Sequence, residues 1–428
     1  MNLYPYQTAL VDEAREAYRD GKRSVLLVAP TGSGKGTMGA AIAKMSIDRG
    51  KRVLWIAHRR ELILDTASRI PIPTRVLLGD ESEGAASVAT VASIQTLSVR
   101  DDWPEADLVV WDEAHHCAAR TYREVSERYP RAHHLGLTAT PERADGKPLG
   151  GAFEALVSGP QIPDLIADDR LVPVETWAPP TDMEGRLAMT PADAVARYAP
   201  DGGAIIYAKN RRHARKIADE TPGCHYVDGD TPKDERDWIL AAFENGTIPT
   251  IANVNILTEG WDCPSARVCI IARGVSHPST YLQMVGRVLR THPGKTHATL
   301  VDLGGVVHRH GLPDEYRVWN LRGKGIRLRG VKALPPVRQC PACGAAFRSA
   351  AVCPRCGYQF APPELPKVSK AELHRVDVAK AWENVTVPQG SSRAHTFYRD
   401  MLMVAKRKGY KPGWAKGMLY REFGRWCP

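Results

Sequence analysis

The sequence predicts an α/β protein with two parallel-sheet lobes in tandem, followed by a small cysteine-bearing module and a short helical segment. Short apolar runs of strand length alternate with helical patterns in both halves of the chain, which is typical of parallel sheets. A stretch from 151 to about 200 is Pro-rich and weakly periodic, which marks the junction between the lobes. The expected strands are 25–28, 52–57, 88–90, 108–111 and 134–137 in the first lobe, and 204–208, 225–228, 250–254, 268–272 and 298–302 in the second.

The bulk properties are those of an ordinary globular chain. Its 428 residues suggest about three domains, and its 43% hydrophobic and 25% charged content is typical. No apolar run approaches the ~18 residues of a membrane span, and the N-terminus lacks a signal pattern. Nine cysteines, four of them clustered near the C-terminus, fit a reducing, cytoplasmic setting. The net charge of +10 favours a polyanionic partner.

The stretch 29–37, Ala-Pro-Thr-Gly-Ser-Gly-Lys-Gly-Thr, has the pattern of a phosphate-binding loop. It lies between a predicted strand and a helix expected over 38–47, so its backbone N–H groups and the helix N-terminus suit an anion. Lys35 supplies a mobile cation for the outer phosphates. Gly36 stands where such loops usually carry the hydroxyl that ligates Mg²⁺, and Thr37 is turned by about 100° from that position. We therefore expect hydrolysis with weaker direct metal ligation. The nucleotide-binding residues expected here are Thr31, Gly32, Ser33, Gly34, Lys35, Gly36 and Thr37.

Paired carboxylates follow the buried strand expected at 108–111. Asp112 is placed to hold Mg²⁺, directly or through water, and Glu113 to orient and deprotonate an attacking water. Two unpaired acids at a buried strand end would be costly for structure alone. The hydroxyls of Thr138 and Thr140 follow another strand, and we expect them near His115 or these acids. The pattern indicates hydrolysis of a nucleoside triphosphate.

Several other polar residues allow two interpretations each. Gln7 has an amide that matches the edge of adenine, or it is only a polar residue at a helix start. His58 and Arg59 come at the carboxyl end of a strand, where α/β sheets bind ligands, and they grip phosphates or form a solvated cluster. Ser93 and Gln95 suit contacts to a nucleic-acid backbone.

The second lobe has no phosphate-binding loop of its own. Gln283, Arg287 and Arg290 are spaced i, i+4 and i+7, which predicts one helical face. On an isolated helix such a face is a solvated basic surface. Beside a lobe with a phosphate-binding loop, it can supply arginine fingers that stabilise charge on the transferring phosphoryl group. We favour the second interpretation.

In their order along the chain, these motifs resemble the superfamily 2 helicases of DEAH type. This is the group whose N-terminal half is shared with the motor subunits of restriction enzymes (type III) and with many phage helicases. The resemblance runs over about residues 3–320. Beyond the P-loop it rests on 6–7 (Tyr-Gln), 112–115 (Asp-Glu-Ala-His), 136–143, 228–232 (Asp-Gly-Asp-Thr-Pro), 259–264 (Glu-Gly-Trp-Asp-Cys-Pro) and 283–290. It implies two RecA-like lobes with ATP between them and nucleic acid across their top.

The resemblance also implies roles for single residues. Gln7 would read adenine, Lys35 would contact the β- and γ-phosphates, and Arg287 and Arg290 would be the fingers. Asp112 would serve Mg²⁺ and Glu113 the water, while Gly260 and Asp262 would face the nucleotide from the second lobe. The residues that would couple hydrolysis to lobe movement are His115, Thr138, Thr140 and Gln283. The residues that would line the nucleic-acid track are His58, Arg59, Ser93, Gln95, Asn255 and Thr258. Two positions depart from the family pattern: Gly36, and Asp65, which stands where a glutamine is usual.

The C-terminal quarter carries two Cys-x-x-Cys-Gly knuckles, Cys340 with Cys343 and Cys353 with Cys356. Two matched knuckles predict a structural Cys₄ zinc ribbon rather than a redox pair. The tail mixes basic and aromatic residues, as at 406–416, either to grip unpaired bases or to form the core of a small helical domain. The expected domains are a first lobe (1–158), a second lobe (159–320), a basic linker (321–337), a zinc ribbon (338–361) and a basic, aromatic C-terminal module (365–428).

These features predict an ATP-dependent helicase or translocase that uses ATP, Mg²⁺ and Zn²⁺. The expected partner is nucleic acid and not a membrane, with single-stranded, forked or branched DNA preferred from the family resemblance alone. The alternative is an ATP-gated clamp that remodels nucleic-acid complexes without separating strands. A nucleotide kinase, which the Lys-Gly-Thr order would also suit, is excluded by the second lobe with its finger arginines.

Overall fold

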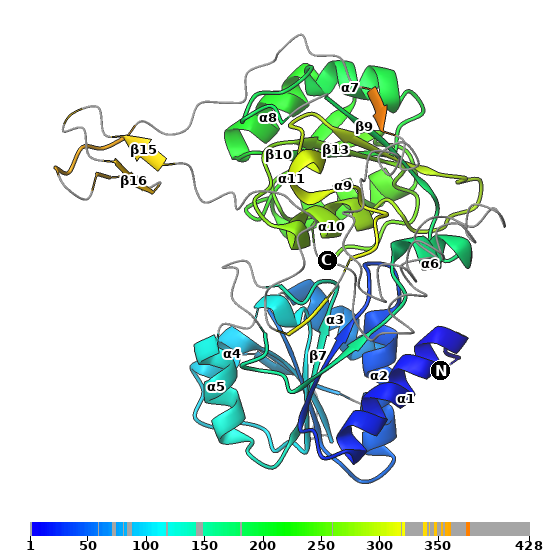
Figure 1. The fold of residues 1–428 in the computed structure, drawn as a ribbon, viewed down its shortest axis with the longest axis vertical. Coiled ribbons are helices and arrows are strands. Elements are labelled where there is room, and N and C mark those ends of the chain that lie inside the picture. Colours follow the sequence, from blue (N-terminus) through cyan, green and yellow to red (C-terminus); the bar gives the residue numbers. More distant parts are fainter. Residues whose placement is uncertain are drawn as a thin grey trace, which may run out of the picture.

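The computed structural model has two α/β lobes, the first blue to cyan and the second green to yellow in Figure 1. It describes residues 2–321 except 59, 71–73, 80, 84–87, 117–118, 143–148, 180–181, 259 and 318. In the C-terminal quarter it describes 337–339, 342, 346–348, 352–353, 356–360 and 374–376. No helix within these ranges is long and apolar enough to cross a membrane.

The first lobe is an eight-stranded sheet in the order β4-β3-β5-β2-β6-β7-β1-β8, parallel throughout except for the β3–β4 pair. Its central strands are buried along their whole length, as expected for a parallel sheet covered on both faces. The strands are β1 (Ser24–Val28), β2 (Val53–Ala57), β3 (Arg75–Leu78), β4 (Glu81–Glu83), β5 (Ala89–Ser93), β6 (Leu108–Trp111), β7 (His133–Thr138) and β8 (Ala155–Ser158). The helices are α1 (Pro5–Arg19), α2 (Lys35–Ile47), α3 (Arg60–Arg69), α4 (Ile94–Ser98), the 3₁₀ turn η1 (Ala114–His116) and α5 (Ala119–Arg128).

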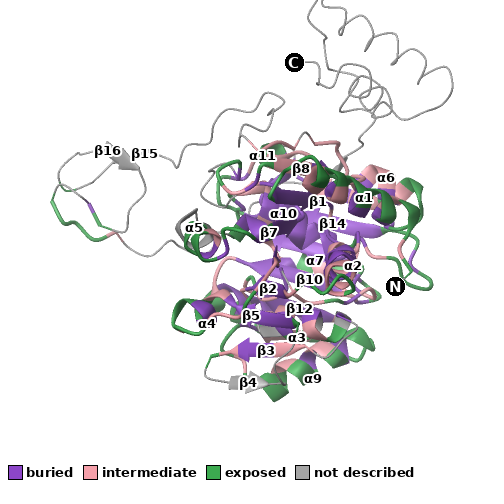
Figure 2. Cartoon of the chain, turned by 90° about the horizontal axis from the view of Figure 1, so that it is seen from below, coloured by how far each residue is buried: buried purple, intermediate pink, exposed green. Residues whose placement is uncertain are grey.

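The second lobe is a seven-stranded sheet in the order β11-β12-β10-β13-β14-β9-β17, in which only β17 runs antiparallel to its neighbour. Figure 2 shows the central strands of both sheets as the buried interior, with the exposed residues mainly on the outer helices and loops. The strands are β9 (Val174–Ala178), β10 (Ala204–Ala208), β11 (Cys224–Val227), β12 (Thr250–Asn253), β13 (Val268–Ala272), β14 (Ala298–Asp302) and β17 (His374–Val376). The helices are α6 (Ile162–Ala167), α7 (Pro191–Tyr198), α8 (Arg211–Glu220), α9 (Lys233–Glu244), α10 (Pro278–Gly286) and α11 (Val307–His310).

The chain crosses between the lobes more than once. The segment 151–200, expected to be an irregular junction, contributes β8 to the first sheet and β9 to the second, so the crossing itself is short. After β14 the chain returns to the first lobe, where the Gly150 amide donates to the Leu321 carbonyl over 2.8 Å. Trp319 packs against the cores of both lobes. Within the described residues up to Leu321, two segments of the chain therefore cross between the lobes.

The described parts of the C-terminal quarter are short strands. β15 (Val337–Gln339) pairs antiparallel with β16 (Ala346–Arg348), and Val352 forms a β-bridge with Gln359. β17 lies within the segment expected to be a separate C-terminal module, yet it pairs with β9 at the edge of the second lobe. The rest of that module lies outside the described residues.

Two buried histidines should make the free energy of unfolding decrease in acid. Burial lowers the pKa of His134 to about 4, and burial with the charges of Lys209 and Lys216 lowers the pKa of His213 to about 4, against an ordinary value of 6.5. Between pH 6.5 and 4, each of these histidines is therefore protonated in the unfolded chain but neutral in the folded protein. Stability falls as pH decreases through this range, and each histidine costs about 2 kcal/mol at pH 5.

The measurement is chemical denaturation at pH 7.5 and pH 5. His213→Asn is the informative variant because its side-chain oxygen can accept from the Lys209 amide, as the His213 Nδ1 does over 3.2 Å, but cannot be protonated. We expect this variant to lose about 2 kcal/mol less than the wild type between the two pH values. An equal loss in both proteins would show that His213 is not one of the groups responsible.

Candidate active site

The phosphate-binding loop connects β1 to α2 as the sequence predicts. Gly32 and Gly34 have φ values of 88° and 80°, which a side chain rarely tolerates, and Gly34 is the N-cap of α2. Lys35 is the first residue of the helix, and its Nζ donates to the Pro30 carbonyl over 3.3 Å. Burial lowers the pKa of Lys35, and the nearby negative charges of Glu113 and Asp112 oppose that effect. The helix begins three residues earlier than predicted, so the loop ends at the lysine.

Gln7 on α1 is bound to this loop. Its Nε2 donates to the Ser33 carbonyl over 2.9 Å, and its Oε1 accepts from the Tyr4 amide over 3.0 Å. The Tyr6 hydroxyl donates to the same Ser33 carbonyl over 2.7 Å. The φ of Gly34 favours glycine, and a Cβ there would lie 2.4 Å from the Gln7 Nε2, so the Gln7 amide would have to move. Gln7 is therefore buried and fixes the shape of the loop.

The two carboxylates lie at the carboxyl end of β6. The Asp112 amide donates to Ile56 on the neighbouring β2, which places both acids opposite the loop. Glu113 has a φ of 46°, a rare conformation for a residue with a side chain, and its amide donates to the Asp112 Oδ1 over 3.0 Å. Burial and the charge of Glu113 raise the pKa of Asp112 to about 6, while Lys35 opposes the shift. This excess of buried negative charge, provided by hard oxygen ligands, suits a divalent cation such as Mg²⁺.

His115 connects these acids to the second lobe. Its Nε2 lies 3.3 Å from the Gln283 Nε2, and its Nδ1 lies 3.0 Å from the Thr138 Oγ1 and 3.3 Å from the Glu113 Oε2. Because the Gln283 amide nitrogen can only donate, the His115 Nε2 accepts and its Nδ1 carries the proton. The Thr138 hydroxyl in turn donates to the Thr140 carbonyl over 2.7 Å. The structure thus brings all four predicted coupling residues into one chain of contacts.

The predicted helical face of Gln283, Arg287 and Arg290 is wrong beyond Gly286. α10 ends at Gly286, and Arg290 forms a β-bridge with Leu171 instead. A glycine is a poor helix former. The buried residues 287 and 288 form a turn, after which the Val172 amide donates to the Leu289 carbonyl over 2.8 Å. The two arginines consequently point to different surroundings.

Arg287 is buried against its own lobe, where its guanidinium donates to the Thr258 carbonyl over 2.7 and 2.9 Å and to the Trp261 carbonyl over 2.6 Å. Arg290 pairs with Asp262. The Arg290 Cγ would lie 3.5 Å from a Cβ built on Gly32, so this arginine adjoins the phosphate-binding loop. Gly286 contacts the loop even more closely, since a Cβ there would lie 2.5 Å from the Thr31 Cβ. Gly260, also expected at the nucleotide, has a φ of 77° and faces Leu62 of α3.

The predicted nucleic-acid residues differ in their accessibility. Gln95 is exposed at the start of α4, whereas the Ser93 hydroxyl is buried as the cap of that helix and accepts from the Thr96 amide over 2.9 Å. Thr258 is buried, and its carbonyl binds Arg287. Asn255 has a φ of 60° and accepts from Arg273 over 2.7 Å. Arg59 lies outside the described residues, as do the side chain of Asp65 and the whole of Cys340 and Cys343.

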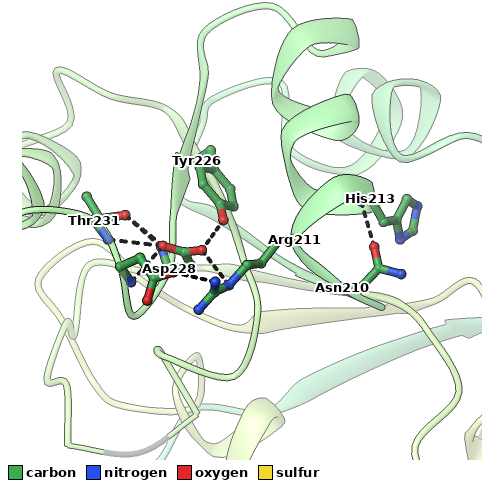
Figure 3. A network of polar contacts seen from close by, with 7 residues as sticks. Asn210, Arg211, His213, Tyr226, Asp228 and Thr231 are labelled. Carbon is green, nitrogen blue, oxygen red and sulfur yellow. Dashed lines mark hydrogen bonds and ion pairs between the residues drawn. The ribbon is translucent and has the colours of Figure 1, made fainter.

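The 228–232 motif forms a loop that is held internally (Figure 3). The Asp228 Oδ1 accepts from the amides of Asp230 and Thr231 over 2.9 and 3.0 Å. Its Oδ2 pairs with Arg211 over 2.9 Å and accepts from the Tyr226 hydroxyl. This network fixes the first residue of α8 beside the end of β11. Sequence reasoning did not assign Arg211 a role, and no local motif marked it.

Two family models match the chain in tandem. The model of the type III restriction enzyme res subunit matches residues 1–143, and that of the helicase conserved C-terminal domain matches residues 191–292. A 51.5 kDa protein of a Lactococcus phage is 29% identical over 385 residues, which cover 83% of each chain. The DNA 3'-5' translocase XPB2 of Sulfurisphaera tokodaii is 24% identical over 65% of this chain and 77% of its own length.

The solved structures agree on the fold. The DUF1998 helicase MrfA bound to DNA has a TM-score of 0.54 and 18% identity, covering 71% of this chain and 46% of that one. Two yeast relatives named as ATP-dependent helicases are longer, and the chain spans 59% and 51% of their lengths. The order of the two domain matches, the two RecA-like lobes and the composition of the site lead to one conclusion. The chain belongs to the superfamily 2 helicases of the restriction-enzyme motor type, and it is an ATP-hydrolysing helicase.

Proposed function

We propose that this protein moves along DNA by hydrolysing ATP in the space between its two lobes. The observation that carries the proposal is the meeting of both lobes at the phosphate-binding loop, with Arg290 and Gly286 of the second lobe against Gly32 and Thr31 of the first. Closure of the lobes on a triphosphate and their reopening after hydrolysis would alternate the grip on one strand. DNA is supported as the track by relatives and neighbours that are named as a DNA translocase and as a helicase bound to DNA.

The proposed chemistry assigns each side chain one task. Lys35 and the loop amides bind the β- and γ-phosphates, and Asp112 holds Mg²⁺, which would supply charge neutralisation. Glu113 takes the proton of the water that attacks the γ-phosphorus, and the bond to the bridging oxygen breaks to release ADP and phosphate. Arg290 leaves Asp262 to stabilise the γ-phosphoryl charge. Gln7 contacts adenine only with the part of its amide that is not already bound to the loop, because its Nε2 donates to the Ser33 carbonyl.

The experiment compares steady-state ATP hydrolysis alone and with single-stranded DNA, duplex DNA, forked DNA or RNA, together with a strand-separation assay on the forked substrate. DNA-stimulated hydrolysis with strand separation supports the proposal. Stimulation by RNA alone contradicts the choice of track. Binding that depends on ATP without any stimulated turnover supports the alternative of a clamp that remodels nucleic-acid complexes.

We also propose that the four cysteines hold a structural zinc ion in the ribbon. Two of these residues, Cys340 and Cys343, lie outside the described part, and no group of three or more His, Cys, Asp or Glu within that part is arranged to hold a metal ion. The described knuckle supports the proposal. The Gly357 amide donates to the Cys353 carbonyl over 2.9 Å, and Gly357 has a φ of 74°, as the motif predicts. β15 and β16 provide the hairpin of the other half.

Zinc removal is expected to unfold the ribbon and to leave the lobes intact. The purified protein should contain one zinc ion per chain by elemental analysis, and Cys356→Ser should lower this below half, since a site of this kind needs all four thiolates. Cys224→Ser, which changes a cysteine of the second lobe, is the matched control and should retain the metal. A wild-type protein without zinc after purification in metal-supplemented buffer would contradict the assignment.

A further inference from the structure

Three histidine rings lie in contact on the first lobe, and only one of them belongs to the hydrolysis motif. The rings of His115 and His116 have centroids 4.1 Å apart, and those of His116 and His58 are 4.3 Å apart. Their positions follow from the sheet: His58 follows β2, the other two follow β6, and these strands are parallel neighbours whose carboxyl ends coincide. His116 is exposed, whereas His115 is buried. The ring of His116 therefore lies between the half-buried His58 and the buried His115.

Each end of this histidine stack reaches a different functional region. At one end, His115 lies 3.3 Å from the Glu113 carboxylate and 3.3 Å from Gln283 of the second lobe. At the other end, His58 is the first residue of the basic strand-end segment expected to grip nucleic-acid phosphates. Rings in contact transmit displacement because a shift of one ring presses on the next, and packed contacts have few intermediate arrangements.

We propose that His116 is a positioning residue that couples nucleic acid bound at the His58 segment to the orientation of His115 and, through it, of Glu113. The inference rests on the proposed function and deepens it, because it names the contact through which the track would control hydrolysis. A displacement of His58 by a bound strand shifts the His116 ring, which turns His115 and alters the geometry at Glu113. His116 does not touch the reacting atoms in this scheme.

The test measures kcat for ATP hydrolysis without nucleic acid and at saturating single-stranded DNA, and the DNA concentration that gives half-maximal stimulation. For His116→Ala we expect the ratio of stimulated to basal kcat to fall at least about fivefold, the lower end of typical coupling between sites. The half-maximal DNA concentration should change less than about twofold, because coupling is lost and binding is not. His116→Phe keeps a ring and should retain most of the stimulation. His297→Ala, an exposed histidine of the second lobe, is the control.

Four results would overturn the proposal while leaving the motor intact. One is a normal stimulation ratio in His116→Ala, and another is an equal fall of basal and stimulated rates. The third is loss of stimulation in His116→Phe, because ring packing would then not carry the effect. A raised half-maximal DNA concentration with normal kcat would make His116 a DNA contact and reject the coupling role. If DNA does not stimulate the wild type, the proposed function fails and this inference fails with it.

Discussion

Replacement of Glu113 by glutamine should lower the nucleic-acid-stimulated rate of ATP hydrolysis by about 10²–10⁴-fold, the usual contribution of a positioned general base. The amide keeps the size of the carboxylate but cannot accept the proton of the attacking water. The Glu113 side chain is held in place for this role. Its backbone is in the left-handed conformation, and its Oε2 lies 3.3 Å from the His115 Nδ1. The rate is measured at saturating ATP and nucleic acid.

Measuring nucleotide binding by Glu113→Gln distinguishes a loss of catalysis from a loss of folding. Glu113→Gln leaves Lys35 and the phosphate-binding loop unchanged, so ATP affinity and the melting temperature should stay close to those of the wild type. The matched control is Glu16→Gln, which alters an exposed carboxylate on α1 and should hydrolyse ATP normally. Residual activity above a tenth of the wild-type rate would remove Glu113 from the role of general base.

Gly286→Ala should reduce ATP hydrolysis by about 10²-fold, because displacement of catalytic groups by about 1 Å has effects of this size. The backbone of Gly286 is helical and accepts alanine without strain; alanine even favours a helix. The added Cβ, however, would lie 2.5 Å from the Thr31 Cβ across the interface between the lobes. Both atoms are close to the backbone, so the lobes must separate to make room. Arg290 would then be withdrawn from the γ-phosphate.

The Gly286→Ala substitution should impair closure of the two lobes and should not lower the stability of the fold. We expect the melting temperature of Gly286→Ala to stay near that of the wild type, while its rate no longer rises with nucleic acid. Gly274→Ala is the matched control, since a Cβ at this exposed glycine of the same lobe meets no atom within 4 Å. A fully active Gly286→Ala would mean that the closed contact between the lobes is not part of the catalytic cycle.

The elements that patterns identify best are those whose residues are uniformly buried. β6, β10, β13 and β14 are central strands of mostly apolar residues, and their bounds were predicted to the residue. Some strands at a sheet edge or next to one were missed. β4 consists of Glu-Ser-Glu, and β9 carries glutamate and threonine, so neither shows an apolar run. These strands form because a neighbour offers free hydrogen-bonding groups, which the local sequence does not encode.

In the candidate site, too, some features follow from the local sequence and others depend on distant segments. The phosphate-binding loop, the acids and the coupling histidine follow strand ends directly, so their meeting at one edge of the sheet could be predicted. Periodicity failed after Gly286, where packing against Thr31 and pairing with Leu171 replace the helix. It also gave no sign that Ser93 would cap a helix or that Arg290 would pair with Asp262. Such side-chain partners come from distant segments and are set by tertiary structure.

The stretch 322–373 has its two attachment points on different lobes. It begins after Leu321, which is bonded to Gly150 of the first lobe, and it ends at β17, which is paired with β9 of the second. The chain on either side of this stretch is therefore attached to both lobes and not to one of them. Each change in the separation of the lobes would therefore change the distance between Leu321 and β17, which lie at the two ends of this stretch.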